Sequence, residues 1–205
     1  MKGLNLAVGE ILRAQRIIIS GHINPDGDSI GSLLSLGLAL EKLKKQVVML
    51  SVDGVPRRYK MLPGARRIVK NCNDETVDLA IAVDCGEKKL LGSAQDIFRK
   101  SKRILEIDHH RFREPFGDIR FVDNKAAAVG ELIYMLIGKL NIRLTGDIAQ
   151  NLLTSIVVET NSFRLPKIRS ATFEVCSELL KKGVDFYKLV NTVFDFFITW
   201  IILPI

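Results

Sequence analysis

Short apolar runs, separated by segments of helical length, most constrain the fold of this 205-residue chain. Most of these runs are apolar at successive positions, which is typical of strands in a parallel sheet that is covered on both faces. The sequence therefore predicts an α/β fold with a mostly parallel five-stranded sheet flanked by helices. The expected strands are residues 17–20, 47–51, 78–83, 103–107 and 119–122.

A helical segment is expected to follow the sheet, because the sequence from residue 126 onward has helical character. The expected helices are residues 4–15, 29–44, 126–140, 147–160 and 171–182, and Gly183 is expected to end the last of them. The loop at 56–65 is expected to hold at most one turn of helix. We predict one domain over residues 1–185, and residues 186–205 are expected to be the start of a connector or an apolar tail.

The composition indicates a globular protein with no single basic arm. Apolar residues make up 47% and charged residues 26%, and the net charge is +7. The basic residues are dispersed, so a solvated surface explains this charge at least as well as an anionic partner does. Three widely spaced cysteines argue against a disulfide framework and a thiolate zinc site. The first ten residues lack the apolar core of a signal peptide, so we expect a cytoplasmic protein.

The apolar end of the chain, residues 196–205, is far short of the ~20 residues that a membrane-spanning helix needs. We therefore expect no membrane association. This segment is expected to pack on the domain itself, on a partner chain or on a domain that is absent. One consequence would be a homodimer formed through the helices or through this tail.

The turn after the first predicted strand holds His22, Asp26 and Asp28 within seven residues. Gly27 allows a tight backbone between the two aspartates, and Pro25 fixes φ just before them. A histidine and two carboxylates so placed form a candidate metal-ligand set. The alternative is that the segment is only a turn, in which Asp28 or Ser29 caps the following helix.

Two further predicted strands also end in residues that bind metals. Asp84 follows the third strand, and Asp108, His109 and His110 follow the fourth. In parallel sheets, ligands bind beyond the carboxyl ends of the strands, so these residues and the first turn are expected at one edge. Mixed imidazole and carboxylate ligands suit manganese or another hard divalent metal better than a thiophilic one.

These motifs resemble those of the DHH phosphoesterases over residues 17–182. The first is His-Ile-Asn-Pro-Asp-Gly-Asp-Ser-Ile-Gly-Ser at 22–32, the second is Val-Asp-Cys-Gly at 83–86, and the third is Ile-Asp-His-His at 107–110. A fourth corresponds to residues 155–164. The chain looks most like the RecJ-like branch, which includes nanoRNase and phosphoadenosine-phosphate phosphatases.

The resemblance implies two divalent metal ions, usually Mn²⁺, with Mg²⁺ as the other possibility. His22 and Asp26 would hold the first ion. The second ion would be held by Asp28, His109 and Glu159, and Asp84 would bridge the two ions and so take part in catalysis.

The same resemblance implies that His110 faces the scissile phosphate and that Asp108 orients the histidine pair. Arg111, Arg113 and Arg164 are candidate phosphate contacts, although surface solvation explains each of them at least as simply.

The chain departs from the family pattern in two ways. Glu159 stands where the family usually has aspartate, so its role as a ligand is open. Members of this branch also carry a C-terminal domain that closes over the cleft, and this sequence is expected to lack it.

The resemblance implies a metal-dependent phosphoesterase that uses a two-metal activated water. Its partners would be short oligonucleotides or nucleotides, whose phosphodiester or phosphomonoester bonds it would hydrolyse. The alternatives are a non-catalytic nucleotide or nucleic-acid binding module and a truncated, inactive domain.

Overall fold

The computed structural model describes residues 2–72 and 77–194. Its central sheet has five strands in the order β2-β1-β3-β4-β5, and every neighbouring pair is parallel. The predicted α/β class with a parallel five-stranded sheet is confirmed. The strands are β1 (Arg16–Ser20), β2 (Gln46–Leu50), β3 (Val77–Val83), β4 (Ser101–Asp108) and β5 (Ile119–Val122).

Side chains alternate between the two faces of the sheet, and both faces are buried. In β1, Ile17 and Ile19 join the larger core, while Ile18 joins a smaller one on the other face. In β3, Ile81 and Ala80 divide in the same way. Burial on both faces explains why the strands are largely apolar instead of alternating apolar and polar residues.

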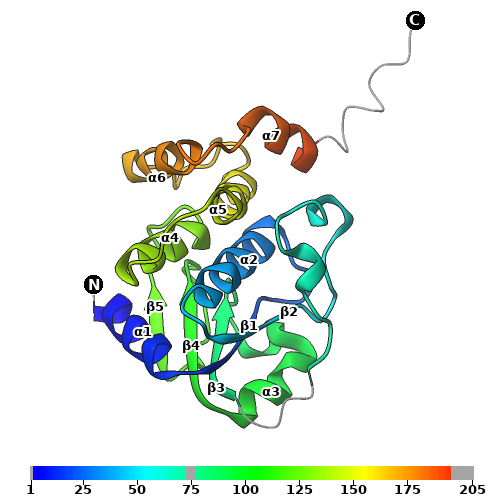
Figure 1. Ribbon diagram of the computed structural model, residues 1–205, viewed down its shortest axis with the longest axis vertical. Coiled ribbons are helices and arrows are strands. Elements are labelled where there is room, and N and C mark those ends of the chain that lie inside the picture. The colour runs from blue at the N-terminus through cyan, green and yellow to red at the C-terminus, as the bar shows by residue number, and fades with distance from the viewer. Residues whose placement is uncertain (1, 73–76, 195–205) are drawn as a thin grey trace, which may run out of the picture.

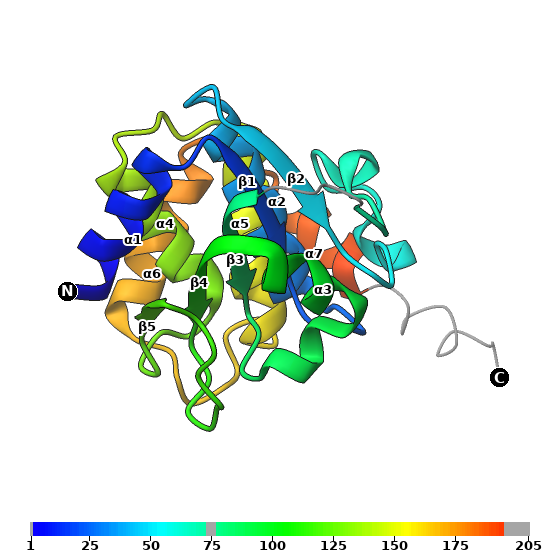
Figure 2. The ribbon, with the colours of Figure 1, turned by 90° about the horizontal axis from the view of Figure 1, so that it is seen from below.

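Helices form layers on the larger core and a single cover on the smaller one (Figures 1 and 2). The first layer consists of α1, α2 and α4, which contact β5, β2 and β4 respectively. In turn, α5 packs on α2 and α4, and α6 and α7 pack on α5. On the other face α3 contacts β3 and β4. The helices are α1 (Lys2–Arg13), α2 (Gly27–Glu41), α3 (Gln95–Lys100), α4 (Val129–Lys139), α5 (Gly146–Glu159), α6 (Ser170–Leu180) and α7 (Phe186–Phe194).

Three parts of the structure were not predicted from the sequence. A 3-10 segment, Lys88–Ala94, leads into α3, and Leu91 in this segment and Phe98 in α3 are buried at a helical spacing. The loop predicted with one turn contains 3-10 turns at Arg57–Tyr59 and Ala65–Arg67. Finally, α7 occupies the first part of the expected connector.

The last segment of the chain is only partly described. Within α7, Leu189 and Val193 are buried in the larger core, so this part packs on the domain. The predicted packing of residues 196–205 concerns residues outside the described ranges. Among the helices described, none is both long and apolar enough to cross a bilayer.

Glycines allow α2 to lie very close to α5. A Cβ at Gly31 would lie 2.5 Å from the carbonyl oxygen of Asn151, and one at Gly27 would lie 2.5 Å from a methyl carbon of Val158. Backbone cannot yield as a flexible side chain does, so any larger residue at Gly31 must push the helices apart. This contact fixes α5, which carries Glu159, against α2, which carries Asp28.

We expect Gly31→Ala to destabilise the protein by roughly 1–3 kcal/mol, because overpacking forces backbone shifts. Gly138→Ala is the matched control, since a Cβ there meets no atom within 4 Å on the exposed side of α4. That change should stabilise the protein by roughly 0.5–1 kcal/mol through helix propensity. Urea unfolding of both variants tests the expectation, and equal stability of the Gly31 variant and the unchanged protein would contradict it.

Candidate metal centre

The three motif-bearing strands are neighbours in the sheet. Because β1, β3 and β4 are adjacent and parallel, the residues that follow them lie along one edge. His22 follows β1, Asp84 follows β3, and β4 ends at Asp108 before His109. Strand order alone therefore brings together segments that are more than 80 residues apart in the sequence.

Three overlapping ligand clusters share this edge, and Asp84 and His109 each belong to two of them. Potential metal-binding atoms of each cluster lie within 4.8 Å of one another. Asp84 belongs to the cluster of His22 and also to the cluster of the two histidines that follow β4. The clusters are His22 with Asp26 and Asp84, Asp28 with His109 and Glu159, and Asp84 with His109 and His110.

Hydrogen bonds to backbone carbonyls orient the rings of His22 and His109. The Nδ1 of His22 lies 2.6 Å from the oxygen of Ile23, and that of His109 lies 3.1 Å from the oxygen of Ala126. A carbonyl only accepts hydrogen bonds, so each Nδ1 carries a proton and Nε2 is the atom left for a metal ion. The carbonyl of Ala126 was not predicted as part of the site.

Each Nε2 faces carboxylates. That of His22 lies 3.5 Å from an oxygen of Asp84. That of His109 lies 3.4 Å from Glu159, 3.7 Å from Asp28 and 3.9 Å from Asp84. The structure thus brings Glu159 to the cluster, although its side chain is one methylene longer than the usual aspartate.

The pKa values show how strongly this site favours positive charge. Burial lowers the pKa of His22, but the hydrogen bond to Asp84 and the nearby carboxylates outweigh it and raise the pKa to about 9. Burial also lowers the pKa of His109, but Glu159, Asp28 and Asp84 outweigh it and raise the pKa to about 9. Clustered carboxylates that stabilise protonated imidazoles would also stabilise a metal cation.

Buried atoms without partners show that the residues fit a metal. Oδ1 of Asp84 and Nε2 of His109 are both buried and have no hydrogen-bond partner. Leaving such groups unpaired in the interior costs roughly 1–3 kcal/mol each. A cation coordinated by them would satisfy both, and the imidazole and carboxylate donors match hard divalent metals.

Asp28 is fully buried and held by several donors. It accepts hydrogen bonds from the backbone nitrogen of Val129 at 2.9 Å and from the hydroxyls of Ser155 at 2.5 Å and Ser32 at 3.1 Å. Burial and the charge of Asp84 raise the pKa of Asp28 well above its usual value. These contacts fix the carboxylate beside His109 and tie α2 to the start of α4.

The expected helix cap was assigned to the wrong residue. Asp26, not Asp28 or Ser29, caps α2, because its side chain accepts a hydrogen bond from the nitrogen of Ser29 at 3.0 Å. The helix begins at Gly27, two residues before the expected start, which moves the cap position upstream. Asp26 thus combines the cap with a position in the first cluster.

Asp108 holds the ring of His110 rather than both histidine rings. It accepts a hydrogen bond from Nδ1 of His110 at 2.8 Å and from the backbone nitrogen of His109 at 2.9 Å. The hydrogen bond that His110 donates to Asp108 raises the pKa of His110. The side chain of His110 is 47% exposed and lines the cavity, and because Asp108 engages Nδ1, Nε2 is the ring nitrogen left for a ligand.

The backbone of Asp84 is strained. Its φ of +55° lies in the left-handed region, which few residues other than glycine adopt. A hydrogen bond from its nitrogen to the oxygen of Ile107, 3.0 Å long, holds it there. Strain of this kind is common where a side chain must be aimed at a functional site.

The three arginines differ in their surroundings. Arg111 and Arg164 are exposed, and the guanidinium of Arg111 lies 5.6 Å from the ring centroid of Phe112. Arg113 instead forms ion pairs with Glu106 and Asp108 and is only 11% exposed. Its charge is therefore neutralised within the protein.

The cavity at the clusters has a volume of about 260 Å³. Its lining consists of His22, Asp26, Asp84, Gly86, Glu87, Leu90, His110, Phe112 and Glu159. Leu90 and Phe112 form its apolar part, and neither was predicted from the sequence.

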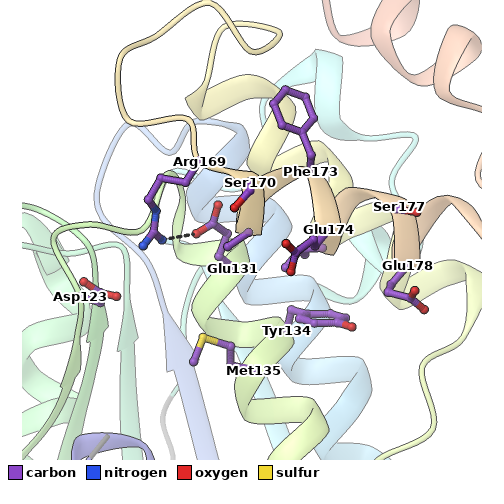
Figure 3. A pocket seen from close by; sticks show the side chains of 12 residues that line it. Asp123, Glu131, Tyr134, Met135, Arg169, Ser170, Phe173, Glu174, Ser177 and Glu178 are labelled. Carbon is purple, nitrogen blue, oxygen red and sulfur yellow. Dashed lines mark hydrogen bonds and ion pairs between the residues drawn. The ribbon is translucent and has the colours of Figure 1, made fainter.

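A larger cavity of about 990 Å³ lies between α4 and α6 (Figure 3). Its most buried acidic residue, Glu131, accepts hydrogen bonds from the Thr172 hydroxyl at 2.5 Å and from Arg169 at 3.2 Å. Because these hydrogen bonds already satisfy the carboxylate, it connects α4 to the start of α6 and is not a free ligand-binding group. The smaller cavity holds the ligand clusters, so chemistry and not size identifies the candidate site.

Comparison with known relatives agrees with the motifs. The model of the DHH family, N-terminal domain, matches residues 16–157. The bifunctional oligoribonuclease and PAP phosphatase NrnA of Thermus thermophilus is 32% identical in a 192-residue alignment that covers 90% of this chain and 56% of that protein. NrnA of Bacillus subtilis is 25% identical over 87% of this chain and 57% of its own length. This chain therefore spans little more than half the length of these relatives.

Solved structures share the fold. An exopolyphosphatase-related protein from Bacteroides fragilis superposes with a TM-score of 0.87 at 26% identity, covering 95% of this chain and 60% of the other. The exonuclease RecJ bound to manganese superposes with a TM-score of 0.57 at 17% identity, covering 95% of this chain and 55% of the other. With the motifs, the family match and the fold in agreement, this chain belongs to the DHH family of phosphoesterases.

Proposed function

We propose that this chain is a metal-dependent phosphoesterase acting on phosphodiester or phosphomonoester bonds of short oligonucleotides or nucleotides. The observation that carries the proposal is the set of ligand clusters, connected through Asp84 and His109, at one edge of a parallel sheet. The similarity to proteins described as oligoribonucleases and PAP phosphatases supports this substrate class.

In this proposal His22 and Asp26 would hold one divalent ion, Asp28, His109 and Glu159 would hold the other, and Asp84 would contribute to both sites. Mn²⁺ fits the donor set, as Mg²⁺ also does, and the manganese bound in the RecJ structure supports Mn²⁺. Two such ions lower the pKa of a water molecule and clamp the phosphoryl oxygens.

The protein's own residues position the phosphate. His110, held through Nδ1 by Asp108, presents Nε2 to the cavity and donates a hydrogen bond to a phosphate oxygen. The buried carboxylate of Asp108 keeps this ring in one orientation and favours its protonated form. Arg111 is the nearest exposed cation in the sequence that could add charge at the rim, and Arg164 is a further candidate.

We further propose that residues 1–185 form the phosphoesterase unit and that α7 begins a connecting region. The strands and ligands of the site all lie before residue 160. Dimerisation through the helices or the end of the chain, and a cytoplasmic location, remain predictions.

A second candidate function is a nucleotide-binding module without catalysis. The observation that favours it is Glu159, which departs from the usual aspartate and is 30% exposed. The side chain of Glu159 is longer than that of aspartate, so the second ion would bind in a shifted position. An ion in that position would no longer align the phosphate.

A substrate screen decides between the two functions. The chain with Mn²⁺ is incubated with a dinucleotide, phosphoadenosine phosphate, a cyclic dinucleotide, single-stranded DNA and pyrophosphate, and released product is measured. We expect hydrolysis of the dinucleotide or of phosphoadenosine phosphate, and its loss with EDTA. Nucleotide binding without turnover under Mn²⁺ or Mg²⁺ would instead indicate the binding module.

A further inference from the structure

Phe112 lies at the rim of the candidate site and is almost fully exposed. Its side chain is 86% exposed, the highest value among the large hydrophobic residues of the described ranges. Single exposed hydrophobic residues are common on proteins. Phe112 differs because it lines the same cavity as His110, Asp84 and Glu159.

The loop that carries Phe112 is anchored by the two residues that follow it. Arg113, the next residue, pairs with the buried carboxylates of Glu106 and Asp108. The nitrogen of Glu114 donates to the oxygen of Gly86 at 2.8 Å, next to Asp84 on the neighbouring strand end. These contacts hold the backbone next to Phe112 in place, so this exposed residue at the cavity lies on an anchored segment.

The anchor extends further along the loop. Glu106, which is fully buried in β4, also accepts hydrogen bonds from the backbone nitrogens of Phe116 and Gly117. One buried carboxylate therefore holds the segment that follows Phe112. The side chain of Phe116 is partly buried against the smaller core, so of the two phenylalanines in this loop only Phe112 is exposed.

The cavity thus has a charged part and an apolar part. Asp26, Asp84 and Glu159 form the charged part, and Leu90 and Phe112 form the apolar part. The backbone of Leu90 is held by a 2.7 Å hydrogen bond from the nitrogen of Ile23, in the first motif. An inorganic phosphate chain has no group that would gain from an apolar surface, whereas a nucleobase has a π-face that stacks on an aromatic ring.

We propose that Phe112 and Leu90 form a nucleobase subsite, in which Phe112 stacks on the base next to the reacting phosphate. Arg111, with its guanidinium 5.6 Å from the Phe112 ring centroid, extends the stacking surface by a cation–π contact. The inference rests on the proposed function, because the phosphate must be held at the ligand clusters for the base to reach the rim. The subsite selects nucleotide phosphates over inorganic ones.

The test compares Phe112→Ala with the unchanged chain on two substrates, a dinucleotide and its analogue in which both bases are replaced by hydrogen. Stacking of one base is worth roughly a 5- to 150-fold change in affinity. We expect KM for the dinucleotide to rise by that factor with kcat nearly unchanged, because stacking binds the ground state and the transition state equally. Both values for the baseless analogue should stay within about twofold of those of the unchanged chain. Phe112→Trp should restore the low KM.

Phe173→Ala is the matched control, because Phe173 is also an exposed phenylalanine but lies on α6, outside the site cavity. It should leave both substrates unchanged. An equal loss on both substrates in Phe112→Ala would show a general structural or docking role and would overturn the subsite. No loss on either would overturn it as well.

A binding measurement keeps the subsite testable without turnover. Trp200 is the one tryptophan of the chain, so Trp200→Phe combined with Phe112→Trp leaves a single fluorophore at the rim. In the presence of Mn²⁺, a dinucleotide with a methylene group in place of the ester oxygen should quench this fluorescence, and the baseless analogue should not. A Phe173→Trp control should show no quenching by either.

Failure of the subsite and failure of the proposed function give different results. If the unchanged chain hydrolyses neither substrate, the proposed activity is wrong, while quenching at position 112 by the base-bearing ligand alone still supports the subsite. If both substrates are hydrolysed and position 112 gives no quenching, the activity stands and the subsite is overturned.

Discussion

Asp84→Asn is expected to reduce hydrolysis by at least about 10³-fold, more than the 10- to 100-fold loss typical of outer-shell metal partners. Its carboxylate oxygens lie 3.5 Å from His22 Nε2, 3.9 Å from His109 Nε2 and 3.6 Å from His110 Nδ1. Among the described residues, only Asp84 belongs both to the cluster of His22 and to a cluster that contains His109. Removing its charge therefore weakens both metal sites at once.

Asp96→Asn is the control for this change, because Asp96 is an exposed aspartate of α3 that pairs only with Arg99 among the contacts described. Steady-state rates with saturating Mn²⁺, together with circular dichroism to confirm folding, give the comparison. An Asp84→Asn variant that is folded and hydrolyses substrate at a rate within tenfold of the unchanged chain would contradict the bridging role.

Glu159→Gln should have the second largest effect, a loss of roughly 10²-fold in activity together with one of the two metal ions. The carboxylate of Glu159 lies 3.4 Å from Nε2 of His109, and an amide neither carries its charge nor binds a hard metal as tightly. Glu159→Asp keeps the charge but is shorter by one methylene, so its activity should be intermediate. Metal content measured by inductively coupled plasma spectrometry tests the loss of the ion.

Glu174→Gln provides the control, since Glu174 is an exposed glutamate of α6 and outside the clusters. If Glu159→Gln binds as much metal as the control does, Glu159 is not a ligand, and the second ion is held by Asp28 and His109 without it. Normal activity in that variant would also remove the main reason to consider a non-catalytic function.

The sequence predicted the fold well because each strand is buried on both faces. Ile17, Ile18 and Ile19 face different cores but are all apolar, so the strand is visible as a continuous run. The position of the site followed from the rule that parallel strands end at one edge, and the strand order confirms that β1, β3 and β4 are neighbours.

The rest of the site depends on contacts that leave no local signal. Asp28 accepts a hydrogen bond from Val129, which is 101 residues away, and His109 is oriented by the carbonyl of Ala126, which any residue could supply. The sequence does not reveal the ion pair of Arg113 with Glu106 either, because a charged residue carries no local signal of which partner it contacts. Helix α3 was missed because it is short and begins within a 3-10 segment.

The central claim is that two divalent ions share Asp84 at this edge of the sheet. Isothermal titration of the metal-free chain with Mn²⁺ tests it most directly, using the unchanged protein, His22→Ala and His109→Ala. We predict two ions per unchanged chain and one in each variant, with different affinities for the ion that each retains. Binding of no Mn²⁺ or of a single ion by the unchanged chain would contradict the claim.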